Sequence, residues 1–125
     1  MISEIMLYIG SIFITLWGVA HIVPTKNVVR DFGPLSEDNK RIITMEWIAE
    51  GLTLIFIGLL VGIITLVGGA QNPVSIIVYR AAAVMLAIMA GLTLVTGART
   101  SIVPIKICPL IKTIVALVFF LGSVW

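Results

Sequence analysis

Four long apolar segments occupy most of this chain of 125 residues. They cover residues 2–23, 42–67, 74–97 and 110–125, and only short connections separate them. A helix that crosses a bilayer needs about 20 apolar residues and satisfies its backbone polar groups internally. The sequence therefore predicts an all-α membrane protein, in which residues 1–125 form one four-helix transmembrane bundle.

The composition favours a fold that faces lipid rather than water. Hydrophobic residues make up 60% of the chain and charged residues 11%, whereas soluble domains hold about 25% charged residues. The formal net charge of +2 comes from scattered Lys and Arg, so we expect no nucleic-acid partner. Because Glu4 replaces the basic region of a secretion signal, we expect the first segment to be retained as a span.

Turn and capping residues predict the limits of the helices. Pro24 ends the first helix, because proline removes a backbone hydrogen bond. Residues 25–33 mix basic and apolar side chains, which predicts a short interfacial helix between helices one and two. Ser36 caps the second long helix, which begins outside the hydrocarbon. Pro109 is expected in the first turn of the fourth helix, before a span that starts at residue 110.

The basic residues outside the spans predict an orientation. The connections after helices one and three hold nearly all of them: Lys26, Arg30, Lys40, Arg41, Arg99 and Lys106, with Lys112 just inside helix four. The opposite side has only Arg80. By the positive-inside rule, both termini are expected outside the cytoplasm in a cell membrane. Tyr79 and Trp125 are then expected near the outer interface, where aromatic rings are enriched.

Three ionisable residues near the ends of helices one and two are candidates for chemistry. His21, Glu46 and Glu50 lie within or beside apolar runs, where a charge costs about 2.5 to 3.5 kcal/mol. Glu46 and Glu50 are four residues apart and share a helix face. Crowded carboxylates repel in a low dielectric, and histidine titrates near neutrality. The three residues are therefore predicted to act as acid and base, with Glu50 the deepest.

Helical periodicity predicts a pocket around these residues. At 100° per residue, His21 shares a stripe with Leu7, Gly10, Ile14 and Trp17, and Glu50 shares one with Glu46, Thr53 and Ile57. We expect these stripes to face each other. Helix three adds a face of Met and Thr residues with Arg99 on its edge. The predicted ligand-binding residues are Trp17, Met85, Met89, Thr93, Thr96 and Arg99.

A purely structural role for the same residues is the alternative. Glu46 and Glu50 would then pair with Arg99, His21 or Arg41 to fix the helix register, or Glu46 would lie in the headgroup region and need no partner. A metal site is not predicted, because di-iron bundles repeat Glu-x-x-His on two helices and no His follows these carboxylates.

A strip of small residues lies on another face of helix two. Gly51, Gly58 and Gly62 form it, roughly 120° from the carboxylate face. Such strips let two helices approach closely. The strip is expected to pack against helix one or three, and a homodimer seam is the alternative.

The layout resembles the small four-helix bacterial membrane proteins called DoxX-like. The similar motifs are Trp17-Gly18-x-x-His21 at the end of helix one, Glu46-Trp47-x-x-Glu50-Gly51 in helix two, and Arg99 after helix three. The resemblance implies an inner membrane location and a quinone-like or lipid pocket lined by His21, Glu46, Glu50 and Arg99. The pocket chemistry is also similar to that of sterol-isomerase-like proteins.

Three functions are compatible with this pattern. The first is a protein that binds or acts on a lipid-soluble small molecule such as a quinone or isoprenoid. The second is an accessory subunit that docks onto a larger membrane complex through the glycine strip. The third is a small proton-coupled transporter, although the two halves show no convincing repeat. Because the sequence has one cysteine, Cys108, and no flavin or haem motif, it specifies no cofactor.

Overall fold

The computed structural model describes all residues, 1–125, and contains only helices. The elements are α1 (Ile2–Ile22), α2 (Thr25–Asp31), α3 (Glu37–Gly68), α4 (Pro73–Val95), the 3-10 turn η1 (Gly97–Arg99) and α5 (Val103–Val124). Four of these helices are long and apolar enough to cross a membrane: α1, α3, α5, and α4 extended through η1. The prediction of an all-α, multi-pass membrane bundle is confirmed.

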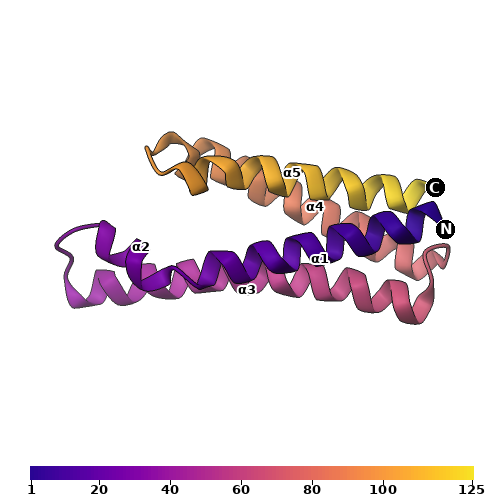
Figure 1. Cartoon of the computed structure of the whole chain (residues 1–125), viewed down its shortest axis with the longest axis horizontal. Coiled ribbons are helices and arrows are strands. Elements are labelled where there is room, and N and C mark those ends of the chain that lie inside the picture. The colour runs from indigo at the N-terminus through magenta and orange to yellow at the C-terminus, as the bar shows by residue number, and fades with distance from the viewer.

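The helices run alternately up and down in two packed pairs. α1 packs along α3 and α4 packs along α5, and the contact between α1 and α5 joins the two pairs (Figure 1). α3 and α4 touch over a much shorter length. Both termini lie at one end of the bundle, and α2 and the α4–α5 connection lie at the other, where the pairs diverge (Figure 1). We call this second end the α2 end.

Small residues hold α1 against α3. The Ser11 hydroxyl donates a hydrogen bond of 2.5 Å to the Gly58 carbonyl oxygen. A Cβ atom added at Gly58 would come within 2.7 Å of the Ser11 carbonyl oxygen, and one at Gly18 would come within 2.7 Å of the Gly51 carbonyl oxygen. The glycine strip therefore packs inside the chain, as one reading of the sequence expected. It is not free to form a homodimer seam or a docking surface.

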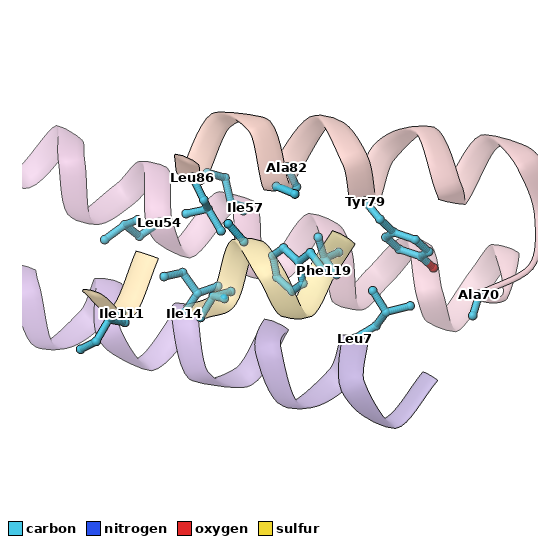
Figure 2. Close-up of a cluster of buried hydrophobic side chains, with 14 residues drawn as sticks. Leu7, Ile14, Leu54, Ile57, Ala70, Tyr79, Ala82, Leu86, Ile111 and Phe119 are labelled. Atoms are coloured by element: carbon cyan, nitrogen blue, oxygen red, sulfur yellow. The ribbon is translucent and has the colours of Figure 1, made fainter. Parts of the chain in front are cut away.

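The apolar core lies between the pairs, toward the end with the termini. Leu7 of α1, Tyr79 of α4 and Phe119 of α5 are fully buried and gather there (Figure 2). Tyr79 is expected from the sequence near the outer interface, but its side chain is fully buried between the helices and does not reach the membrane surface. Its ring fills the core, and its hydroxyl is hydrogen-bonded at 2.9 Å to the buried Thr65 hydroxyl. This bond supplies the partner that a buried phenol needs.

Apolar side chains also cover the outside of the bundle. Exposed residues such as Ile12, Phe56, Leu66, Ile88 and Leu117 come from all four long helices. A monomeric soluble protein rarely exposes a continuous apolar surface of this extent. The exposed side chains thus suit contact with lipid tails.

The first residues of α2 and α3 agree with the sequence prediction, whereas the first residue of α5 does not. Ser36 caps α3 by accepting a hydrogen bond of 3.1 Å from the Asn39 amide. α5, however, begins at Val103 rather than at residue 110. Pro104 occupies its first turn, where a missing N–H costs nothing, and Pro109 lies inside the helix. Membrane helices tolerate such a proline because neighbouring groups satisfy the freed carbonyl.

Candidate functional site

A buried ion pair joins α3 to α5 near the α2 end. The Lys112 side chain is fully buried and its ammonium group forms a salt bridge with the Glu50 carboxylate. The same ammonium donates a hydrogen bond of 3.0 Å to the Thr93 hydroxyl of α4. Three helices therefore converge on one cation.

The depth of Lys112 explains why it needs this partner. Lys112 lies twelve positions before the last residue of α5, Val124, which is about 18 Å along a helix axis. In a hydrocarbon layer of about 30 Å, its backbone lies well inside the bilayer. An unpaired ammonium at that depth is strongly unfavourable. Glu50 neutralises it, which accounts for the depth of this carboxylate.

The ion pairs agree only in part with those expected for a structural role. The only ion-pair contacts in the chain join Glu50 to Lys112 and to His21. Arg41 and Arg99 are exposed and have no carboxylate within 4.0 Å. Glu46 is also exposed and unpaired. The helix register is therefore fixed through Lys112, and the suggested pairs with Arg41 and Arg99 do not form.

His21 lies beside the ion pair and is held by Trp47. Its Nε2 atom is 3.6 Å from the second Glu50 oxygen. The imidazole stacks on the Trp47 indole, with ring centroids 4.0 Å apart and planes at 14°. The Trp47 indole N–H donates a hydrogen bond of 2.6 Å to the His21 carbonyl oxygen. Although Nε2 is buried, it has no hydrogen-bond partner.

A cavity of about 390 Å³ borders His21 and Glu50. Its lining residues come from α1, α2, α3, α4 and the start of α5. They belong to the α2 end, and Figure 1 shows that the helix pairs diverge at this end. Trp17, one of the predicted ligand-binding residues, lines the cavity, and the Trp17 indole N–H donates to the Cys108 thiol at 3.4 Å. Apolar and aromatic side chains make up half of its walls. A cavity of this size with few polar groups is typical of a small-molecule site.

A separate groove of about 820 Å³ runs between α3 and α4. It exists because these two helices barely touch. The predicted pocket residues on this side are Glu46, Met85, Met89, Thr93 and Thr96.

The single pocket predicted from the sequence is thus divided into a cavity and a groove. Five residues line both spaces and form the boundary between them: Trp47, Glu50, Thr93, Ile102 and Ile105. Glu50 remains 31% exposed at this boundary, whereas the His21 side chain is 9% exposed. Glu50 can therefore be approached from either space.

Arg99 is the predicted site residue that the structure places elsewhere. It lines neither the cavity nor the groove, and its side chain is exposed. The prediction extended the helical face of Thr93 and Thr96 to Arg99. α4 ends at Val95, however, and the 3-10 turn that follows changes the direction of later side chains.

The helix stripes also meet different neighbours from those expected. His21 does meet Glu50, but Leu7 and Gly10 of the same stripe contact α5, through Gly122 and Phe119. The N-terminal half of α1 therefore packs against both α3 and α5.

Sequence reasoning missed Lys112, Trp47 and Cys108 as parts of the site. Lys112 had a readable signal, since it follows an apolar stretch and lies inside a span, as Glu50 does. The sequence pattern groups Lys112 with the loop charges, because the fourth span is predicted to begin only two residues earlier. Trp47 and Cys108 gave no comparable signal, because buried aromatic and thiol side chains are ordinary in any core.

Comparisons with known proteins identify no relative of this chain. No family model, curated protein or solved structure matches the chain. The resemblance to DoxX-like proteins therefore stays a prediction. Within the chain, no three His, Cys, Asp or Glu side chains converge as ligands for a metal ion.

Proposed function

We propose that this protein binds a lipid-soluble small molecule, such as a quinone or an isoprenoid, in the cavity beside His21 and Glu50. The observation that supports this function is that His21 lines the cavity while its buried Nε2 atom has no hydrogen-bond partner. A buried polar atom without a partner is unfavourable by about 1 to 3 kcal/mol. A ligand oxygen or hydroxyl in the cavity removes this penalty.

The buried charges of the site favour a ligand with a neutral polar head. Glu50 and Lys112 compensate each other, and the other charged lining residue, Asp31, is an exposed carboxylate, so the buried part of the cavity offers no net charge to an ionic ligand. His21 and the free lone pairs of Glu50 supply hydrogen bonds, and Trp17 and Ile105 supply apolar contact. A quinone carbonyl or an isoprenoid alcohol has a head of this kind.

The groove between α3 and α4 favours a ligand that arrives from the lipid. Met85 and Met89 line it, and it reaches the same Glu50 carboxylate as the cavity. Glu46 lies four residues before Glu50 on the groove side. For a chemical step on the ligand, His21 and Glu50 are the groups placed to move a proton, with Glu46 as a further carboxylate.

The proposal includes an orientation in the cell membrane. Six exposed basic residues occupy the α2 end: Lys26, Arg30, Lys40, Arg41, Arg99 and Lys106. The opposite end has Arg80 alone. Lys112 is left out of this comparison of exposed charges, because it is buried and paired with Glu50. The positive-inside rule then assigns the cavity to the cytoplasmic side and both termini to the other side.

The test is the substitution His21→Phe. Phenylalanine retains a ring that can stack on Trp47 but removes the unpartnered Nε2 atom. We expect binding of a short-chain ubiquinone and of farnesol, measured by titration of the purified protein and by native mass spectrometry, to fall about tenfold or more, because one hydrogen bond in a desolvated site is lost.

Gln71→Leu is the matched control, because Gln71 is polar but lies at the opposite end of the bundle, beside Trp125. It should bind both probes as the unaltered protein does. Unchanged binding by a folded His21→Phe protein, or no binding of either probe by the unaltered protein, would reject the proposed function.

A further inference from the structure

A third hollow, of about 630 Å³, lies between α2 and the first turns of α3. None of its lining residues takes part in the cavity or the groove. α2 lies beside the start of α3 at the end of the bundle away from the termini (Figure 1). The chemistry of this hollow is therefore independent of the proposed ligand site.

Three basic side chains line the hollow. Lys26 and Arg30 are one turn apart on α2, and Lys40 comes from α3. None of the three has a carboxylate within 4.0 Å. Glu37 is the one acidic residue of the lining, so positive charge remains in excess. Like charges four residues apart repel each other on a helix, which makes the arrangement unfavourable without an anion.

The other polar groups of the lining are already occupied as donors. The Thr25 hydroxyl donates to the Ile22 carbonyl oxygen, and the Thr44 hydroxyl donates to the Lys40 carbonyl oxygen at 2.7 Å. The free donors that surround the hollow are therefore cationic. A guanidinium fork with two ammonium groups matches the oxygens of a phosphate better than a single carboxylate does.

The position of α2 identifies the source of the phosphate. α2 begins three residues after the span α1 ends at Ile22, and its buried Val29 packs the helix onto the bundle. The Lys26 and Arg30 side chains of α2 are exposed. This geometry puts the hollow at the level of lipid headgroups, where anionic phospholipids attract clustered Lys and Arg.

We infer that the hollow between α2 and α3 binds the headgroup phosphate of an anionic phospholipid through Lys26, Arg30 and Lys40. The site holds α2 flat on the membrane surface, next to the cavity. The bound phosphate offsets the repulsion among the three cations.

The experiment compares two triple variants of the full chain in nanodiscs. Lys26→Gln/Arg30→Gln/Lys40→Gln removes the three cations of the hollow. Arg41→Gln/Arg99→Gln/Lys106→Gln removes the same charge from exposed positions at the same end, outside the hollow. The measurement is the retention of phosphatidylglycerol over phosphatidylcholine, by native mass spectrometry.

We expect the unaltered protein and the control triple to retain phosphatidylglycerol selectively. A direct charge-assisted hydrogen bond to a phosphate changes binding about tenfold or more, so the hollow triple, which loses these bonds, should lose roughly 100-fold or more in selectivity. Equal losses in both triples would overturn the inference, because they would indicate a diffuse surface charge.

Inorganic phosphate provides the second arm of the experiment. Displacement of phosphatidylglycerol by millimolar inorganic phosphate would overturn the assignment to a lipid and indicate a site for the free anion. Persistence of the lipid under these conditions supports the lipid headgroup. Quinone or farnesol binding by the hollow triple should stay unchanged, which separates this inference from the proposed function.

Discussion

Lys112 and Glu50 determine the chemistry of the site at the scale of single residues. The lysine is the most deeply buried charge of the chain, and Glu50 is its only ionic partner. Replacing a buried ion pair by apolar residues is often neutral, but removing one partner leaves a buried charge. The two residues should therefore be studied together.

We predict that Glu50→Gln destabilises the protein by about 3 kcal/mol, because it leaves the Lys112 ammonium unpaired in an apolar interior. Glu50→Gln/Lys112→Met should recover most of this loss. The measurement is thermal unfolding in detergent micelles, followed by circular dichroism.

Glu46→Gln is the control for this prediction, since Glu46 is exposed and unpaired one turn away on the same helix. It should unfold at the temperature of the unaltered protein. Equal destabilisation by Glu46→Gln and Glu50→Gln would show that the salt bridge does not stabilise the fold.

At the scale of elements, the close packing of α1 on α3 is the most extensive contact between two helices. The glycine strip brings the two backbones together, and the Ser11 to Gly58 hydrogen bond crosses the interface. α3 and α4, by contrast, stay apart and leave the groove between them. The helix pairs are thus joined unevenly, which positions His21 against Glu50 and leaves Glu50 accessible.

We predict that Gly58→Leu destabilises the bundle by about 1 to 3 kcal/mol, because the added atoms collide with Ser11 and Thr15 of α1. Thermal unfolding in micelles again provides the measurement.

The control is Gly91→Leu on α4, where an added Cβ meets no atom within 4 Å. This variant should unfold as the unaltered protein does. A Gly58→Leu protein with unchanged stability but an altered oligomeric state would instead revive the homodimer seam.

The distribution of polar groups is asymmetric at the scale of the whole molecule. The cavity, the basic hollow and six exposed cations all lie at the α2 end. The end with the termini holds the packed core around Leu7, Tyr79 and Phe119. This asymmetry underlies the proposed orientation.

Cysteine labelling tests the orientation. Cys108 is the only native cysteine and is buried, so Cys108→Ala provides a background without reactive thiols. In intact cells, a membrane-impermeant maleimide should label Gln71→Cys, between α3 and α4, but not Ser101→Cys, between η1 and α5. Both positions are exposed. The reverse labelling pattern would contradict the proposed topology.

The sequence by itself determined the number of spans, the short α2, the cap of α3 and the end of the bundle that holds His21 and Glu50. Each follows from a local requirement: a bilayer demands about 20 apolar residues per helix, and caps and turns depend on a few neighbouring residues. α5 was the exception, because Pro104 and Pro109 both suit a first turn.

Only the tertiary structure decided the partner of Glu50, the unpaired His21 Nε2, the burial of Tyr79 and the separation of cavity from groove. These features depend on how each helix is rotated about its axis and shifted along its neighbour. Helices that are apolar on all sides, as these are, give little periodic signal for that rotation. Packing between residues distant in sequence, such as Ser11 with Gly58 and Glu50 with Lys112, fixes it instead.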